Sequence, residues 1–150
     1  MNKQITLEAL DVNNWLKVCD LSVSDEQKKI FTIPNVYWIG ISRYEEKSEL
    51  FAIKADCEYV GLIGGGFDED GITRYINPFM IDRHHQKNGY AKPAILLMIN
   101  YLRQTLGVEK ININHHKENV IAGKIYESLG FTIYNETDME YQRKLDLLKY

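Results

Sequence analysis

The chain is short of cysteine and has no long apolar run. Its 150 residues include two cysteines, Cys19 and Cys57, which lie far apart and lack metal-ligand spacing. This usage excludes a disulfide framework and indicates a reducing compartment. No apolar run is long enough to cross a membrane, and the first residues lack the apolar core of a signal peptide. We therefore expect a cytoplasmic protein without a membrane partner.

The chain also has no strong excess of charge of one sign. The net charge is −3 and there is no basic run, so a nucleic-acid partner is not expected. Apolar residues make up 45% of the chain and charged residues 26%, which is ordinary for a globular protein. The length suits one domain over residues 1–150. A mildly acidic protein favours a cationic small molecule through local carboxylates.

Metal-ligand patterns are absent from the sequence. Histidines occur in two adjacent pairs, His84-His85 and His115-His116, and no carboxylate or thiol spacing completes either set. Adjacent side chains also point in different directions, so we expect no metal site. The acidic run at residues 68–70, followed by Gly71, predicts a turn because the later ligands of a calcium loop are missing.

Apolar periodicity predicts a mixed α/β chain. The expected strands cover residues 4–8, 49–55, 58–67, 72–81 and 110–114, followed by a hairpin over 131–145. Two short helices are expected near the N-terminus, one capped by Asn13 or Asn14 and running to Cys19, and one starting at Ser24 with Gln27 in a capping box. Three more are expected over residues 36–47, over a range that begins between 89 and 93 and ends at 106, and over residues 120–129. Pro78 and the glycines at 64–66 predict a bulge between two strands.

One loop has the features of an anion site. Residues 86–91 read Gln-Lys-Asn-Gly-Tyr-Ala and precede an apolar helical pattern that contains Pro93. Proline is tolerated only in the first turn of a helix, so the N–H groups of residues 87–92 lie at a helix start, where free donors and the helix dipole hold phosphate. Gly89 allows close approach and Lys87 adds charge. A plain helix-capping loop is the alternative, and the loop lacks the Lys-Ser/Thr ending of a P-loop and the three glycines of a dinucleotide fingerprint.

Two motifs together resemble one family. Residues 86–91 resemble the pyrophosphate loop Gln/Arg-x-x-Gly-x-Gly/Ala of the GNAT superfamily of acetyl-CoA-dependent N-acetyltransferases. Residues 119–131 resemble its other signature, Asn-x-x-Ala-x-x-x-Tyr-x-x-x-Gly-Phe, at every signature position. The resemblance implies a mixed central sheet of about seven strands, flanked by helices, with two central parallel strands splayed apart. It also implies direct transfer of acetyl from acetyl-CoA, the co-substrate, to a primary amine.

The resemblance implies where acetyl-CoA binds. Pantetheine would pair along the opened strand edge, and N–H groups near Met80 and Ile81 would polarise the thioester carbonyl. Asn119 would cap its helix and contact the cofactor. The cofactor-binding residues expected in this way are Phe79, Met80, Ile81, Gln86, Lys87, Asn88, Gly89, Tyr90, Ala91, Lys92, Asn119 and Tyr126.

Tyr126 is the catalytic candidate that the resemblance implies. It would protonate the departing thiolate, and a phenol with a pKa of about 10 suits a thiolate of similar basicity. The alternative is a packing role on an amphipathic helix. No general base is evident. Asn77 stands where the polyamine-acetylating branch often has an acidic residue, and an amide cannot serve as the base. Tyr75 and the acids of residues 68–70 are nearby in the sequence, but each can equally be a solvated strand end or turn. The simplest assumption is that a water chain carries the proton to solvent.

The acceptor is the least constrained part of the prediction. Residues 21–27 resemble a segment of bacterial diamine/spermidine acetyltransferases, which favours a polyamine such as spermidine or spermine. The alternatives are another small amine such as an aminoglycoside, a protein amino group, or a non-catalytic acyl-CoA-binding sensor. A homodimer is left open. The carboxylates available for a polyamine are Asp25, Glu26, Glu45, Glu46, Glu49 and those of residues 68–70.

Overall fold

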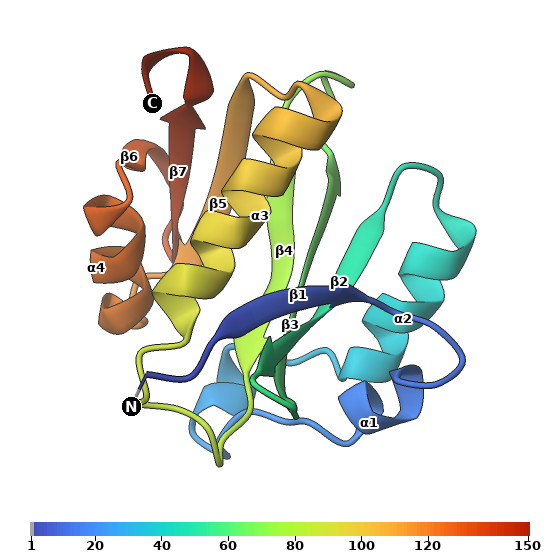
Figure 1. Ribbon diagram of the computed structural model, residues 1–150. Helices are drawn as coiled ribbons and strands as arrows, with labels where there is room; N and C mark the ends of the chain where they lie inside the picture. The colour runs from blue at the N-terminus through green and yellow to red at the C-terminus, as the bar shows by residue number, and fades with distance from the viewer. Residues whose placement is uncertain (1) are drawn as a thin grey trace.

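A seven-stranded sheet in the order β1-β2-β3-β4-β5-β7-β6 frames the molecule in the computed structural model, which describes residues 2–150 (Figure 1). Every neighbouring pair is antiparallel except β4 and β5. The strands are β1 (Ile5–Ala9), β2 (Glu49–Ala55), β3 (Glu58–Phe67), β4 (Arg74–Ile81), β5 (Lys110–His116), β6 (Thr132–Glu136) and β7 (Glu140–Asp146). The helices are α1 (Trp15–Cys19), α2 (Asn35–Tyr44), α3 (Ala91–Leu106) and α4 (Val120–Ser128), with 3₁₀ turns η1 (Gln27–Lys29) and η2 (Leu147–Lys149).

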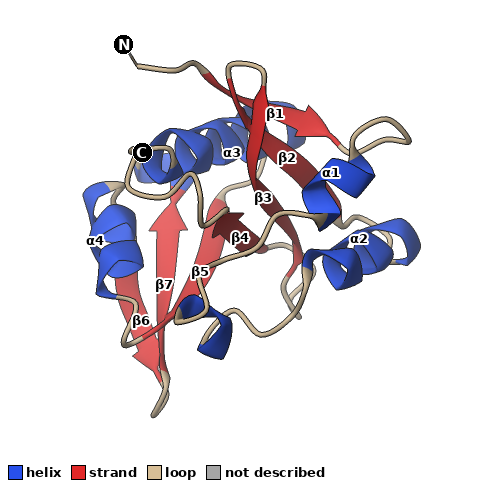
Figure 2. Cartoon of the chain, turned by 90° about the horizontal axis from the view of Figure 1, so that it is seen from below, coloured by secondary structure: helices blue, strands red, loops and turns tan. Residues whose placement is uncertain are grey.

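Alternation along the strands divides the core into two layers, because successive side chains of a strand point to opposite faces. On β3, Ile63 packs with α3 and α4, whereas its neighbour Leu62 packs with α1 and α2. Figure 2 shows α4 beside β6 and β7, and α1 with α2 near the end formed by β1 to β3. The mixed α/β fold predicted from the sequence is confirmed.

Several predicted boundaries need correction. Asn14 precedes α1, but its side chain does not cap that helix and instead donates to Glu8 and the carbonyl of Ala9. The helix predicted after Ser24 is only the single turn η1. There Ser24 Oγ accepts from the N–H of Gln27 at 3.3 Å, while the Gln27 side chain bonds elsewhere and leaves the capping box half formed.

Two further elements are shorter than predicted. Helix α2 ends at Tyr44, and Lys47 beyond it takes a φ of +61°, which a helix cannot continue through. Strand β4 begins at Arg74 rather than at residue 72, because Asp70 accepts from the N–H groups of Ile72 and Thr73 in a turn. Both differences come from local turn chemistry that apolar periodicity does not report.

The sheet opens between its two central parallel strands. Only Arg74 with Ile111 and Tyr75 with Asn112 are paired between β4 and β5. On the other side of β4, the register with β3 shifts between Ile63 and Gly65, across from Asn77 and Pro78. The predicted bulge and splay are thus confirmed, and β4 beyond Tyr75 has a free edge toward β5.

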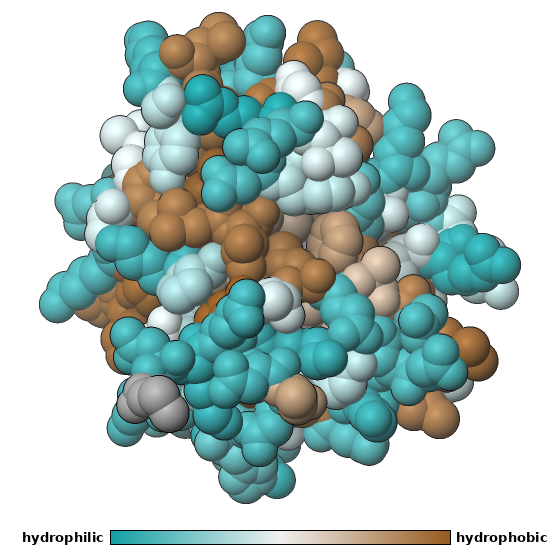
Figure 3. Space-filling view, in the orientation of Figure 1, coloured by the Kyte–Doolittle hydropathy of each residue, from teal (hydrophilic) through white to brown (hydrophobic). Residues whose placement is uncertain are grey.

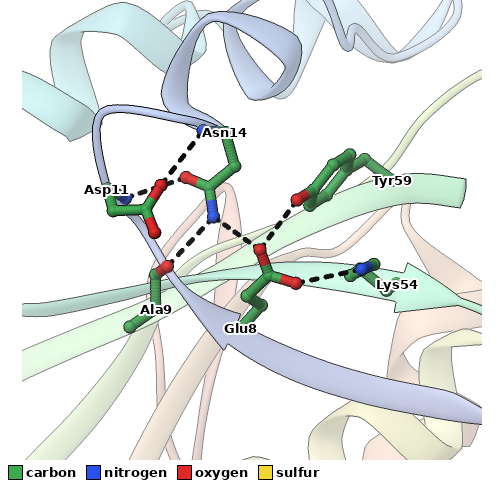
Figure 4. Close-up of polar contacts among 6 residues, drawn as sticks. All are labelled: Glu8, Ala9, Asp11, Asn14, Lys54 and Tyr59. Atoms are coloured by element: carbon green, nitrogen blue, oxygen red, sulfur yellow. Dashed lines mark hydrogen bonds and ion pairs between the residues drawn. The ribbon is translucent and has the colours of Figure 1, made fainter. Parts of the chain in front are cut away.

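The edge strand β1 is tied down by one carboxylate, that of Glu8 (Figure 4). Its Oε1 accepts from Asn14 Nδ2 at 2.9 Å and from the Tyr59 hydroxyl at 2.7 Å. Its Oε2 lies 3.0 Å from Lys54 Nζ. These bonds, the hydrogen bond from Asn14 first, lower the pKa of Glu8 to about 2. One side chain therefore links β1 to β2, β3 and the start of α1.

Within residues 2–150, no helix is both long and apolar enough to cross a membrane. Cys19 and Cys57 are both free thiols.

Candidate active site

The start of α3 is an uncapped helix N-terminus. The helix begins at Ala91, which puts Pro93 in its first turn as predicted. Tyr90, at the N-cap position, makes no capping hydrogen bond, and the first turn has no acidic residue. Within residues 2–150, no main-chain N–H from Lys87 to Lys92 donates to a protein acceptor. Free donors at the positive end of a sixteen-residue helix form a site for a phosphate group.

The loop before α3 is curled by two residues in the left-handed region. Lys87 has a φ of +64° and Gly89 a φ of +77°. A positive φ next to a right-handed residue such as Tyr90 turns successive N–H groups to the same side. A Cβ at Gly89 would meet no protein atom within 4 Å, so the space above this backbone is open to a ligand. The surface around the loop is hydrophilic, in the lower part of Figure 3.

Side chains from another part of the fold hold this loop. Gln86 Nε2 donates to the carbonyl of Ile81 at 2.9 Å and to Gln27 Oε1 at 2.6 Å. Asp82, which is buried, accepts from the N–H of Ser22 at 2.9 Å. In Figure 1 the loop after β4, in yellow-green, lies beside the light-blue segment that contains η1. Gln27 and Asp82 were not predicted to support this loop, because nothing in their spacing along the chain indicates contact across the fold.

The end of β4 points into the opening. Met80 is buried against the α1 and α2 layer, and Phe79 and Ile81 on either side of it are half-buried against the other layer. The edge of this segment toward β5 has no strand partner, since pairing stops at Tyr75. An extended amide-bearing ligand can therefore add to the edge as a strand does. The arrangement fits the pantetheine arm of acetyl-CoA, with the pyrophosphate at the α3 N-terminus.

Helix α4 supplies Asn119 and Tyr126. The Asn119 side chain accepts from the N–H of Ala122 at 3.3 Å, which confirms its predicted capping role. Tyr126 is 4% exposed, and its burial raises the pKa of the phenol well above its ordinary value, while Arg143 acts in the opposite direction. The phenol therefore stays protonated at neutral pH. Burial makes it a weaker acid than a free phenol, so its pKa matches that of a thiolate less closely than the sequence predicts.

The Tyr126 hydroxyl has no hydrogen-bond partner within residues 2–150. The enclosed side-chain atoms without a partner there are Trp38 Nε1 and Arg74 Nε, so the Tyr126 hydroxyl keeps some contact with solvent. A hydroxyl without a protein partner can bond to a bound group.

Comparison with known proteins identifies this arrangement. Residues 11–131 match the model of the acetyltransferase (GNAT) family. The chain belongs to this family. The prediction from the two motifs is confirmed, and acetyl-CoA is the acetyl donor of such an enzyme.

The chain is similar to a curated bacterial protein and to solved structures. A probable spermine N(1)-acetyltransferase of Bacillus subtilis subsp. natto is 23% identical over 157 residues, covering 93% of this chain and 95% of the relative. The crystal structure of the Vibrio cholerae spermidine N-acetyltransferase in complex with CoA and spermine has a TM-score of 0.82 at 17% identity, over 98% of both chains. A dodecameric structure of the Vibrio cholerae enzyme has a TM-score of 0.75 at 18% identity, over 98% of this chain and 96% of the other.

Several carboxylates of this GNAT acetyltransferase are already engaged. Glu49 binds Arg74 at 2.7 Å and accepts from the Tyr101 hydroxyl at 3.0 Å. Asp70 accepts from Thr73 within its turn, and Asp68 accepts from Asn112 Nδ2 at 2.8 Å. These acids lie near the start of β4, away from the loop that follows its end. Glu49, Asp68 and Asp70 thus already have partners within the protein.

The remaining acids of that set are exposed. Asp25 pairs with Lys28 at 3.1 Å, and Glu26, Glu45 and Glu46 make no ion pair within residues 2–150. Asp25 and Glu26 precede η1, whose Gln27 accepts a hydrogen bond from Gln86 in the loop before α3. The same described part of the chain holds no cluster of three or more metal-ligating side chains.

Proposed function

We propose that this acetyltransferase transfers acetyl directly from acetyl-CoA to a primary amine of a polyamine such as spermidine or spermine. Three features support the transfer: the unpaired β4 edge, the uncapped α3 N-terminus and the Tyr126 phenol, which is buried in the layer that α3 and α4 cover. The acceptor rests on the substrates named for the similar proteins and on the acids beside the loop.

The chain's residues would act in three ways. The N–H groups of residues 87–92 hold the pyrophosphate, and the edge at Phe79, Met80 and Ile81 aligns the pantetheine arm and polarises the thioester carbonyl. Acetyl-CoA supplies the activated acetyl group. Tyr126 donates the proton that the departing thiolate takes up. The acetyl group passes directly to the amine, without a covalent enzyme intermediate. Much of the rate enhancement then comes from holding the two substrates in the geometry of the reaction.

The cofactor contacts of Gln86, Lys87, Asn88, Gly89, Tyr90, Ala91, Lys92 and Asn119 are part of this proposal. Self-association is a further prediction. One Vibrio cholerae relative is described as dodecameric, and α2 here exposes Val36, Tyr37 and Tyr44 by 51%, 65% and 88%. A second copy of the chain would cover such an apolar surface.

The test is acetyl-CoA turnover, followed as thiol release, with spermidine, putrescine, an aminoglycoside and a lysine peptide at low and high salt. We expect the largest kcat/KM for spermidine and a higher KM at high salt, because salt screens attraction between a polycation and carboxylates. Activity should also climb from neutral to alkaline pH, since the attacking amine must first lose its proton.

A charge variant locates the acceptor groove. Removing both charges at Asp25→Asn and Glu26→Gln should raise the spermidine KM several-fold, because two carboxylates that attract the polycation are lost. Glu109→Gln, an exposed acid between α3 and β5 that is not among the predicted acceptor carboxylates, serves as the control. A preference for the peptide or a spermidine KM indifferent to salt would defeat the polyamine assignment. Tight CoA binding with no turnover on any amine would favour the sensor alternative.

A further inference from the structure

Arg143 is a buried cation without an anionic partner. Its residue is 8% exposed, and no ion pair within residues 2–150 includes it. Its Nε donates to His115 Nε2 at 2.9 Å and its Nη1 to the carbonyl of Phe131 at 3.4 Å. Burying an uncompensated charge destabilises a fold, so a buried and unpaired guanidinium calls for an explanation.

His115 holds this cation without neutralising it. The imidazole accepts from Arg143 at Nε2, and its Nδ1 lies 3.0 Å from the carbonyl of His116, which places the ring proton on Nδ1. Burial lowers the pKa of His115, which keeps the ring neutral at physiological pH. The guanidinium is therefore fixed in place while its charge stays available to a neighbouring group.

Tyr126 is that neighbour. Its ring centroid lies 5.5 Å from that of His115. Gly123, one turn earlier on α4, leaves room for the pair: a Cβ there would lie 2.9 Å from His115 Cε1 and 3.5 Å from Arg143 Nη2. Because Gly123 has no side chain, α4 settles directly onto His115 and Arg143. The helix that carries Tyr126 thus rests on a fixed positive charge.

We propose that Arg143, held by His115, is a positioning residue whose charge stabilises the negative charge that develops on Tyr126 as the phenol donates its proton. This inference rests on the proposed function. The O–H bond of Tyr126 breaks, an S–H bond forms on the departing CoA thiolate, and the resulting phenolate recovers a proton from solvent. A phenolate buried in an apolar layer would be costly, and the cation beneath α4 offsets that cost.

The test is a double-mutant cycle between Arg143→Met and Tyr126→Phe, read as kcat by thiol release. Tyr126→Phe alone should lower kcat by roughly 10²–10⁴-fold, the range of general acid catalysis. Arg143→Met should lower kcat by about tenfold, an effect of one charge on the barrier, with an unchanged KM for acetyl-CoA. In the Tyr126→Phe background it should cost nothing further, since no phenolate then forms.

Two variants separate charge from packing. Arg143→Lys keeps the charge and should recover part of the activity. Arg143→Gln keeps hydrogen-bond donors without the charge and should lower kcat as Arg143→Met does. It replaces Arg143→Met in the test if the methionine variant does not fold. Lys144→Met makes the same change at the next, outward-facing position of β7 and should leave kcat unchanged. An equal loss from Arg143→Met in both backgrounds would overturn the inference. Near-normal turnover of Tyr126→Phe alone would instead remove Tyr126 from the proposed mechanism and the inference with it.

Discussion

Gly89 combines two properties in the loop before α3, where we propose that the pyrophosphate binds. Its φ of +77° lies where residues with a Cβ are strained, and the space around it is open. The first property shapes the loop, and the second leaves its N–H groups accessible. A side chain here would both strain the backbone and occupy the space over the α3 N-terminus, so the two effects must be separated by a control.

We expect Gly89→Val to weaken acetyl-CoA binding by at least about tenfold, equivalent to about 1.4 kcal/mol, while the fold persists. Gly71→Val is the matched control, because Gly71 also has a positive φ, +68°, and open space, in the turn before β4. Isothermal titration calorimetry measures both affinities, and thermal melts compare the strain. Equal affinities for the two variants would contradict the assignment of the pyrophosphate to this loop.

Some of the site could be predicted residue by residue and some could not. Gly89, Asn119 and Tyr126 stand at fixed offsets within two local motifs, so the sequence indicates them. The bond from Gln86 to Gln27 joins residues 59 positions apart, and no local pattern encodes it. The sequence contains only a weak indication of the role of Arg143. The alternation of β7 places Arg143 and Leu145 inward, and a charged residue at an inward position of a strand is unusual.

At the scale of elements, the strands were predicted best where apolar runs end at clear turns. The bounds of β2 and β3 match the prediction at every residue, since Asp56 and Cys57 form the turn between them. The 3₁₀ turn η1 was predicted as a longer helix, because Ser24 does cap it but the chain leaves the turn at Ile30. The edge strand β1 was found from its alternation, whereas the Glu8 cluster that fastens it was not.

We expect Glu8→Gln to destabilise the fold at pH 7 by about 1 kcal/mol, a figure reduced because 38% of the side chain is exposed and solvent screens it. The pKa of Glu8 is lowered on folding, so its contribution is complete above the unfolded value of 4.5 and fades as the pH falls from there toward about 2. Urea unfolding of both proteins at pH 7, 4 and 3 should show their difference shrinking with acidity.

Glu58→Gln is the control for this series. Glu58 pairs with Lys3 at 2.7 Å but is 57% exposed, so solvent screens the pair and its loss should cost less stability than the loss of Glu8. If the two variants lose the same stability, or if the Glu8 difference does not change with pH, the cluster around Glu8 does not fasten β1.

For the whole molecule, the central opening divides the sheet into two parts. β1 to β4 lie on one side and β5 to β7 on the other, joined in the ladder by Arg74 with Ile111 and Tyr75 with Asn112. Helix α3 packs on strands of both parts and adds a second connection. A ligand that pairs with the β4 edge and also sits at the start of α3 would stiffen the place where the sheet is least connected.

CoA should therefore stabilise the whole fold and protect this opening in particular. At 100 times its Kd a ligand adds about 2.7 kcal/mol, which for a domain of this size raises Tm by roughly 5–10 °C. Hydrogen exchange should slow at the amides of Phe79–Ile81 and of residues 87–92. ADP, which has the pyrophosphate but no pantetheine arm, should protect only the second group, because nothing then reaches the β4 edge. Protection confined to residues 87–92 with CoA as well would mean that the arm does not lie along β4, and that the opened sheet is not where the thioester is held.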